Sequence, residues 1–377
     1  MKILVTGGAG FIGSWLVASL LNDGHSVTVV DNLSPQIHGA LPQPDVEWLR
    51  EDRGVEFVRG DVRNAAVMDN ALARADAVVH LAAETGTGQS MYQIAYYYDV
   101  NQQATAALFE AIATRHRHIR RVVLASSRSV YGEGAYSLDG RLVVPGSRSA
   151  ARLAQGEFEP LGPKGEPLQL IGTPEDAPPS PASIYAATKL ANEQLGRICA
   201  EAYGITVAAL RFQNVYGERQ SLRNPYTGIL SIFSNRMRQN LPINIFEDGL
   251  ESRDFVHVSD VVRGITLALR ADLPAFTVAN IGAGQPTSVM QVAQTLKRLL
   301  DSQSELTVTG DFRVGDIRHC YADLSNVRSL LGFAPAVDLE TGLRAFCDWV
   351  VTQSIGEDRS AQAMAELTKL GLSKAGV

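Results

Sequence analysis

Residues 5–21, VTGGAGFIGSWLVASLL, determine how the rest of the chain is interpreted. The stretch continues an apolar run and places Gly7, Gly10 and Gly13 in a G-x-x-G-x-x-G pattern just before a helical pattern. Glycines let the backbone turn tightly and approach a pyrophosphate, whose negative charge is favoured by the free N–H groups at a helix start. The stretch therefore predicts the strand, turn and helix that open a dinucleotide-binding unit.

Asp31 ends the second apolar run, where dinucleotide-binding units place an acidic residue beside the adenosine ribose. Because a carboxylate accepts from the 2′-hydroxyl and repels a 2′-phosphate, the sequence favours NAD over NADP. A glycine turn followed by a surface aspartate is the alternative. Asp61, in the third run, is expected either to accept from the adenine amino group or to cap a helix. The predicted cofactor-binding residues are Gly7, Gly10, Phe11, Ile12, Gly13, Asp31, Asn32, Asp61, Val62, Leu81, Ala82, Ala83, Tyr185 and Lys189.

Short apolar runs alternate with helix-length segments along the first part of the chain. The runs lie at residues 2–7, 26–31, 55–62, 77–83, 121–127 and 207–212. Such alternation predicts a parallel sheet with helices on both faces, an α/β fold of the doubly wound Rossmann type. We expect residues 1–212 to form this NAD-binding domain, with an insertion at about 133–180. Residues 213–377 are expected to form mainly a smaller mixed α/β substrate lobe, with some segments returning to the first domain.

Composition excludes several classes of protein. The 377 residues carry a net charge of −6, so no broad basic surface is expected and nucleic-acid binding is disfavoured. No apolar run is long enough to cross a bilayer, and the first strand begins at Lys2, without room for a leader. The three scattered cysteines suit buried thiols in a reducing cytoplasm, and they support neither disulfides nor a metal site.

Tyr185 and Lys189, in the segment SIYAATKLANE, share one face of a predicted helix. Only small residues separate them, so a flat group can approach that face. Most pairs with this spacing are a core aromatic residue beside a solvated amine. A phenol, with a pKa of about 10, becomes a base near neutral pH only where its anion is stabilised, as by a nearby ammonium group.

Six blocks, GGAGFIG, HLAA, ASSRSVYG, YAATK, RFQNVYG and RDFVHVSD, occur in the order found in the extended short-chain dehydrogenase/reductase family. The chain resembles that family, whose members mostly modify nucleotide-activated sugars. The resemblance implies an amino-terminal NAD domain and a smaller carboxyl-terminal domain for the sugar nucleotide. It also implies that Tyr185 is the catalytic tyrosine, that Lys189 is its partner, and that Ser127 contacts the reacting oxygen; Ser126 is the alternative to Ser127.

The two residues after Ser127 narrow the chemistry that the resemblance implies. Family members that eliminate water have Asp-Glu there, and those that decarboxylate have a glutamate at the second position. This chain has Arg128 and Ser129, so no extra acid or base is available and redox at one carbon is the supported chemistry. Two kinds of enzyme fit redox at one carbon. A 4-ketosugar reductase consumes NADH, whereas a 4-epimerase regenerates NAD in each turnover.

The resemblance also implies substrate contacts and a substrate class. Residues 83–90 and 217–230, which contain Thr87 and Arg219, are similar to segments of bacterial dTDP-L-rhamnose 4-epimerases, which interconvert dTDP-L-rhamnose and dTDP-6-deoxy-L-talose. Alternatives are a UDP-hexose 4-epimerase, an NAD-dependent nucleotide-4-ketosugar reductase and an NAD-sensing binding protein. A homodimer formed through the helix that bears Tyr185 and its neighbouring helix is expected by resemblance. The predicted substrate-binding residues are Thr87, Ser127, Asn214, Arg219, Phe246, Arg253, Arg313 and Asp316.

Overall fold

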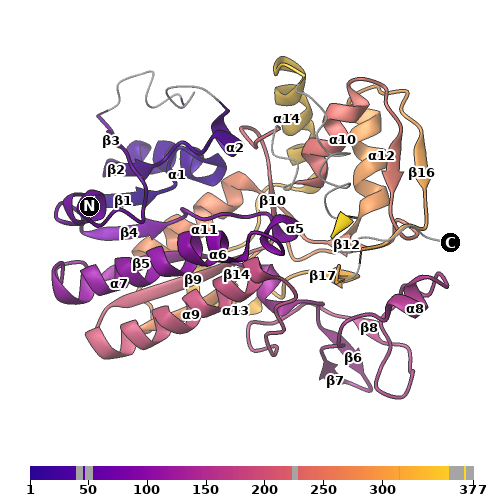
Figure 1. Ribbon diagram of the computed structural model, residues 1–377, viewed down its shortest axis with the longest axis horizontal. Coiled ribbons are helices and arrows are strands. Elements are labelled where there is room, and N and C mark those ends of the chain that lie inside the picture. Colours follow the sequence, from indigo (N-terminus) through magenta and orange to yellow (C-terminus); the bar gives the residue numbers. More distant parts are fainter. Residues whose placement is uncertain (40–45, 47–53, 223–227, 314, 356–368, 371–377) are drawn as a thin grey trace.

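The centre of the fold is a parallel sheet with helices on both faces (Figure 1). The computed structural model describes residues 1–39, 46, 54–222, 228–313, 315–355 and 369–370, and within them seven strands form this sheet in the order β14-β9-β5-β4-β1-β2-β3. The strands are β1 (Lys2–Thr6), β2 (Ser26–Asp31), β3 (Glu56–Arg59), β4 (Ala77–His80), β5 (Arg121–Ser127), β9 (Thr206–Phe212) and β14 (Phe276–Ile281). The strand order reverses between β1 and β4, and ligands bind at such a switch point in doubly wound sheets. The predicted fold class is confirmed.

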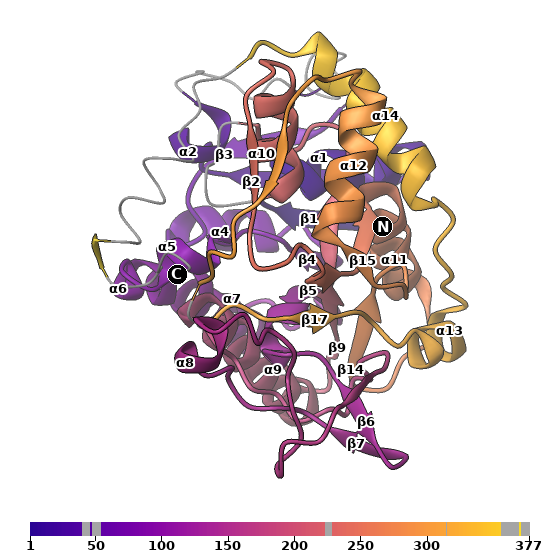
Figure 2. The same cartoon turned by 90° about the vertical axis from the view of Figure 1, so that its right-hand side faces the viewer.

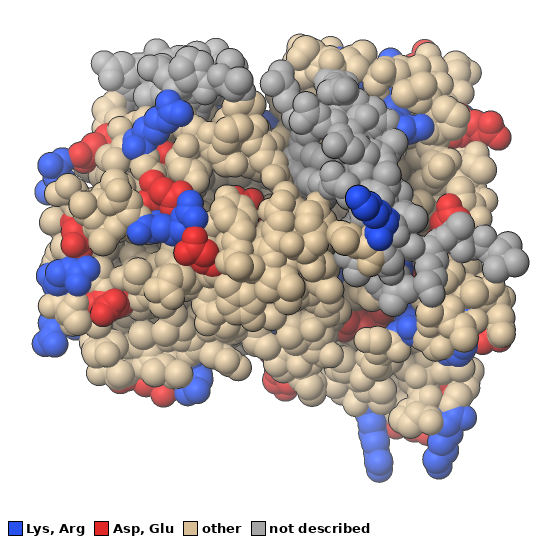
Figure 3. Space-filling view, in the orientation of Figure 1, with Lys and Arg blue, Asp and Glu red and all other residues tan. Residues whose placement is uncertain are grey.

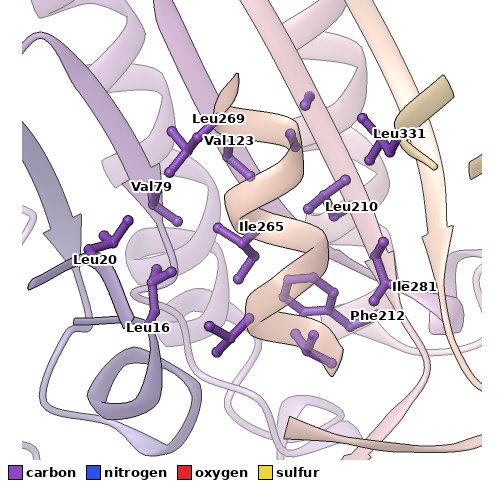
Figure 4. Packing of buried hydrophobic residues seen from close by; sticks show 14 of the residues in the cluster. Leu16, Leu20, Val79, Val123, Leu210, Phe212, Ile265, Leu269, Ile281 and Leu331 are labelled. Atoms are coloured by element: carbon purple, nitrogen blue, oxygen red, sulfur yellow. The ribbon is translucent and has the colours of Figure 1, made fainter. Parts of the chain in front are cut away.

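Both faces of the sheet are apolar, which explains the continuous Val, Ala and Leu runs of its strands. On one face lie α1 (Phe11–Asn22), α11 (Val258–Arg270) and α13 (Ser325–Leu331), and on the other α4 (Ala65–Leu72), α7 (Ala104–Thr114) and α9 (Ile184–Tyr203). Figure 4 shows Ile265 and Leu269 of α11 among Val79, Val123 and Leu210 of the strands. This packing holds the carboxyl ends of the strands in fixed positions.

A second lobe stands at the carboxyl edge of the sheet (Figure 2). It has its own apolar core. Its helices are α10 (Ile229–Met237), α12 (Val289–Leu299) and α14 (Leu339–Thr352). Its strands are β10 (Asn214–Tyr216), β11 (Ile243–Ile245), β12 (Ser252–Arg253), β13 (Phe255–His257), β15 (Thr287–Ser288), β16 (Leu306–Val308) and β17 (His319–Cys320). The six predicted sheet strands are present, but β14, from the second half of the chain, was not predicted as a sheet strand. Together with α11, it is a segment that returns to the first domain.

The segment predicted as an insertion contains ordered elements and packs against the second lobe. It comprises β6 (Tyr136–Leu138), β7 (Arg141–Val143), α8 (Ala150–Leu153) and β8 (Gln169–Leu170). The Arg318 guanidinium, whose side chain is 1% exposed, pairs with Glu159 of the insertion at 2.7 Å and with Glu247 of the lobe at 2.9 Å. Glu133 accepts hydrogen bonds from the backbone N–H groups of Arg318 and His319, both at 2.7 Å. The insertion therefore fixes the loop before β17.

The molecular surface carries both signs of charge. On the face drawn in Figure 3, basic and acidic side chains are interspersed, without a broad field of one sign. No helix in the described part of the chain combines the length and apolar character needed to span a bilayer. In the same residues, no group of three or more His, Cys, Asp or Glu side chains is placed to hold a metal ion.

Candidate functional site

A cavity of about 470 Å³ lies over the carboxyl ends of the sheet strands, at the switch point between β1 and β4. Every residue predicted to bind the cofactor lines this cavity, from the glycine turn to Tyr185 and Lys189. Of the residues predicted to contact substrate, Thr87, Ser127 and Asn214 also line it. The sequence motifs, which are far apart along the chain, are therefore brought together in one place.

The glycine turn between β1 and α1 leaves no room for side chains. Gly7 has a φ of +70°, and a Cβ added there would lie 2.8 Å from the backbone nitrogen of Ala82. A Cβ on Gly13 would lie 2.2 Å from the carbonyl oxygen of Gly7. Gly10 immediately precedes α1 and, like Phe11 and Ile12, lines the cavity. The backbone at the start of α1 is thus open to an anionic group, as a pyrophosphate requires.

Asp31 is 8% exposed at the end of β2 and is held by two backbone donors. Its Oδ2 accepts from the N–H of Ala9 at 3.0 Å, and its Oδ1 accepts from the N–H of Leu33 at 2.9 Å. Each carboxylate oxygen has a further lone pair, so Asp31 retains the capacity to accept from ribose hydroxyls. The glycine turn and this oriented carboxylate together fit the adenosine diphosphate half of NAD.

Asp61 lines the same cavity and has protein partners. Arg63 Nη2 lies 2.8 Å from Asp61 Oδ2, and Asn32 Nδ2 donates to the same oxygen at 3.1 Å. The hydrogen bonds from Arg63 hold the pKa of Asp61 well below its ordinary value. The alternative that Asp61 caps a helix is wrong, because the side chain of Asn64 accepts from the N–H groups of Ala66 and Val67 at the start of α4.

Helix α9 carries Tyr185 and Lys189 along its cavity face and is capped by Ser183. Lys189 is 5% exposed, and its Nζ donates to the carbonyl oxygen of Ala125 in β5 at 2.8 Å. The same nitrogen lies 5.8 Å from the centre of the Tyr185 ring. Lys189 is therefore a buried, oriented cation, and the alternative of a solvated amine beside a core tyrosine does not describe this pair.

The pKa of Tyr185 differs from the sequence-based expectation, in which a nearby ammonium group stabilises the phenolate. Burial raises the pKa of Tyr185 above 10, and the groups that act in the opposite direction are the Ser127 hydroxyl, through a hydrogen bond, and the Arg128 guanidinium. Burial also lowers the pKa of Lys189 to about 8. The protein's own groups thus leave the pKa of the phenol above its ordinary value, and a further positive charge in the cavity would lower it. An oxidised nicotinamide ring carries such a charge.

Ser126 and Ser127 end β5, and both line the cavity, but they have different partners. Ser126 is 4% exposed and donates to Glu193, which forms a buried ion pair with Arg211 at 2.8 Å. The Ser127 Oγ accepts from the N–H of Ser129 at 3.2 Å, in the short 3₁₀ helix η2 (Arg128–Tyr131). Because the Ser126 hydroxyl is already bonded to a buried carboxylate, Ser127 is the serine better placed to contact a substrate.

Sequence reasoning missed the side chains that hold α9 in place. Asn101 is 1% exposed in a π-helical turn, η1 (Tyr98–Gln103). Its amide oxygen accepts from the N–H of Glu84 at 2.8 Å, and its amide nitrogen donates to Thr188 of α9 at 3.2 Å. Asn192 of α9 donates back to the carbonyl oxygen of Asn101 at 2.8 Å. Such a turn frees carbonyl groups from the regular helical pattern, which single-sequence patterns do not reveal.

The other predicted substrate residues do not line this cavity. Arg253, 8% exposed, donates to the carbonyl oxygens of Arg318 at 2.9 Å and Ile317 at 2.8 Å, and its nearest carboxylate partner is Asp316 at 3.3 Å. Arg253 does not pair with its sequence neighbour Asp254, whose carboxylate accepts from three backbone N–H groups of the loops at 283–284 and 322.

Three further predicted substrate residues, Phe246, Arg313 and Arg219, take part in contacts between a guanidinium group and an aromatic ring. The Arg313 guanidinium lies 4.8 Å from the centre of the Phe246 ring, and the Arg219 guanidinium lies 5.1 Å from the centre of the Trp15 ring. Thr87, in contrast, is exposed at the start of the short helix α5 (Thr87–Ser90), at the cavity wall. Two further short helices, α2 (Pro35–His38) and α6 (Ile94–Tyr97), precede and follow α5 along the chain.

Comparison with known proteins places these features in context. Residues 3–151 and 157–282 match the family model of the NAD-dependent epimerase/dehydratase family. A dTDP-L-rhamnose 4-epimerase of Burkholderia thailandensis is 39% identical over 93% of this chain and 95% of its own length. The structure of a Thermotoga maritima UDP-glucose 4-epimerase with UDP-glucose is similar, with a TM-score of 0.74, 29% identity and coverage of 93% of this chain and 99% of that one. A Bacillus cereus UDP-glucuronic acid 4-epimerase with UDP-glucuronic acid and NAD has a TM-score of 0.75, 28% identity and the same coverage.

Proposed function

The chain belongs to the NAD-dependent epimerase/dehydratase family, and on this premise we propose that it is a nucleotide-sugar 4-epimerase that interconverts dTDP-L-rhamnose and dTDP-6-deoxy-L-talose. The observation that carries the proposal is the combination of Tyr185 and the buried Lys189, both at the cavity, with Arg128 and Ser129 at the positions that follow Ser127. This cavity has a base for a hydroxyl proton but, at those positions, no acid or base to eliminate water.

We infer the following roles for the protein's own groups. Tyr185 takes the proton of the sugar 4-hydroxyl and returns it, while Ser127 hydrogen-bonds the same oxygen. Lys189 orients the ribose next to the reacting ring and contributes positive charge near the phenol. NAD, when bound between the glycine turn and Lys189, supplies the hydride acceptor for C4. The small residues between Tyr185 and Lys189 keep that face of α9 open to it.

The choice of a dTDP-deoxyhexose is supported by the similarity pattern. Identity to the dTDP-L-rhamnose 4-epimerase is 39%, whereas it is 28–29% to the two UDP-sugar epimerases of known structure. The segments that contain Thr87 and Arg219 resemble the former group, and part of the second segment lies outside the described residues. Thr87 is exposed at the cavity wall, where a sugar nucleotide would pass.

A UDP-hexose 4-epimerase is the second candidate, favoured by the similarity of the whole fold to enzymes solved with UDP-sugars. The experiment that separates the two incubates NAD-loaded protein with dTDP-L-rhamnose, dTDP-6-deoxy-L-talose, UDP-glucose and UDP-glucuronic acid, and resolves the products by chromatography. Conversion confined to the dTDP-sugars supports the proposal. Conversion of UDP-glucose with no reaction of dTDP-L-rhamnose would replace it, and binding of NAD without turnover of any sugar would favour an NAD sensor.

We also propose that the enzyme is a homodimer that pairs through α9 and the neighbouring helical segment 94–114. Five apolar or aromatic side chains on these elements are exposed: Ile94 at 49%, Tyr96 and Tyr98 at 39% each, Ile198 at 54% and Tyr203 at 50%. Exposed apolar groups on adjacent helices suit a helix-on-helix interface. Light scattering after gel filtration gives the mass of the particle, and replacing Ile198 with Glu should shift a dimer toward the monomer.

A further inference from the structure

Gln213 carries a buried side-chain amide that forms no hydrogen bond within the described part of the chain. The residue follows Phe212 at the end of β9, is 4% exposed and lines the cavity that contains Tyr185 and Ser127. Its main-chain N–H donates to the carbonyl oxygen of Ile281 at 2.9 Å, so the backbone is held as part of the sheet. Both side-chain atoms, Oε1 and Nε2, are buried, and within the described residues neither forms a hydrogen bond.

An unpaired buried amide destabilises a protein, because it has lost hydrogen bonds to water and gained none in return. An apolar side chain of similar size at position 213 would avoid that loss. A glutamine at this place is therefore explained best by a ligand that completes its hydrogen bonds. Buried polar groups that lack partners occur where a site is built for a ligand.

Arg128 is the second polar residue of the proposed site. Ser127 of β5 pairs in register with Phe212 of β9, so Arg128 and Gln213 each stand one residue beyond that pair on adjacent strands. Arg128 also lines the cavity, and its pKa is affected by burial, which lowers it, and by the charges of Arg253, Asp316 and Glu133. The backbones of Arg128 and Gln213 are thus adjacent, and a guanidinium and an amide both belong to the lining of the cavity that contains Tyr185 and Ser127.

The donor and acceptor pattern indicates the chemistry of the ligand. A glutamine amide offers two N–H donors and one carbonyl acceptor, and a guanidinium offers only donors. An anion such as a phosphate would use the donors but would leave the amide oxygen unpaired. Hydroxyl groups both donate and accept, so a ring that carries several of them satisfies the whole set. A neutral polyol next to Tyr185 is the ligand that fits.

We propose that Gln213, assisted by Arg128, is a specificity residue that binds hydroxyl groups of the sugar ring and recognises the hexose instead of the nucleotide. The proposal rests on the proposed function insofar as the substrate is a nucleotide-activated sugar. It predicts that the identity of residue 213 affects the selection among hexoses and leaves the binding of the nucleoside diphosphate unchanged.

The test uses NAD-loaded Gln213→Met, which keeps the length of the side chain and removes the amide. With the sugar nucleotide that the wild type turns over, kcat/KM is expected to fall about 10- to 100-fold, the loss of one or two hydrogen bonds. Affinities for dTDP, UDP and NAD, measured by calorimetry, should stay within about twofold. The melting temperature without sugar should rise by about 1–3 °C, because the unpaired amide is gone. Gln303→Met, at an exposed position far along the chain, is the matched control.

Three outcomes would overturn the proposal. A lower melting temperature with unchanged kcat/KM would make Gln213 a structural residue. Equal losses of affinity for the nucleoside diphosphate and the nucleotide sugar would assign the amide to the diphosphate, and a loss of NAD affinity would assign it to the cofactor. If the Met variant does not fold, Gln213→Asn, which withdraws the amide by one methylene group, must lower kcat/KM without lowering the melting temperature.

Failure of the proposed function gives a different result. A wild type that turns over none of the four sugars refutes the 4-epimerase proposal. The role of Gln213 is then judged from binding alone, by the ratio of the affinities for a nucleotide sugar and for its nucleoside diphosphate, with and without the amide. A ratio that does not change in Gln213→Met would overturn the inference.

Discussion

Lys189→Met should make the NAD-free protein more stable near neutral pH while it removes activity. Lys189 is 5% exposed, and burial lowers its pKa from 10.5 to about 8. At about 1.4 kcal/mol per pKa unit, burying this ammonium group costs about 3 kcal/mol at pH 7. The hydrogen bond to the carbonyl oxygen of Ala125 is lost in the variant, so we expect a net gain of about 1–3 kcal/mol in the free energy of unfolding.

The pH dependence of this stability difference separates the cost of burying the ammonium group from any change in packing. Below about pH 8 the ammonium is charged in both states, and the full penalty is present. Between about pH 8 and pH 10.5 the unfolded chain holds the proton that the folded protein has lost, so wild-type stability increases with pH relative to the variant. Above about pH 10.5 the side chain is neutral in both states and the penalty is absent.

The assay is urea unfolding of both NAD-free proteins at several pH values from about 7 to about 10. The stability of the wild type relative to Lys189→Met should increase by about 2–3 kcal/mol over that range. Lys164→Met, at an exposed position, is the matched control for removing one lysine. A difference between wild type and Lys189→Met that stays constant with pH would refute the conclusion that Lys189 is a buried cation with a lowered pKa.

Three further changes test other parts of the account. Tyr185→Phe should abolish turnover and leave NAD bound, and sugar conversion by that variant would reject the assigned base. Gly13→Ala places a Cβ 2.2 Å from a carbonyl oxygen of the turn, so NAD affinity should fall at least tenfold by fluorescence titration; unchanged affinity would contradict the geometry of the turn. Glu193→Gln removes the partner of the buried Arg211 and should cost about 3–5 kcal/mol in urea unfolding, against about 0.5 kcal/mol or less for Glu201→Gln in an exposed pair.

The parts of the fold that depend on local patterns could be predicted from the sequence. The glycine turn, the first six sheet strands and the Tyr185–Lys189 face follow from residue spacing, and the fold class, the family and the NAD cofactor are confirmed. Strand β14, with the sequence FTVANI, was missed because it lies in the half of the chain assigned mainly to the other lobe. Its place in the sheet is set by pairing with β9, which is a long-range contact.

The partners of charged side chains could not be predicted, since they depend on which loops meet in space. Arg253 was expected to bind substrate, yet its donors reach the carbonyl groups of residues 317 and 318. Gln213 lies inside the motif RFQNVYG, where the pattern drew attention only to Asn214. Its significance depends on the lack of a partner for a buried amide, which only the packed structure reveals.

The fate of the hydrogen at C4 tests the central claim most directly. NAD-loaded protein is incubated with dTDP-L-rhamnose carrying deuterium at C4, and the epimeric product is analysed by mass spectrometry and NMR. A 4-epimerase that oxidises and reduces one carbon predicts that the deuterium stays at C4 in the product and that no NADH is consumed. Loss of the deuterium to solvent, or product formation that consumes NADH in equal amount, would contradict the account.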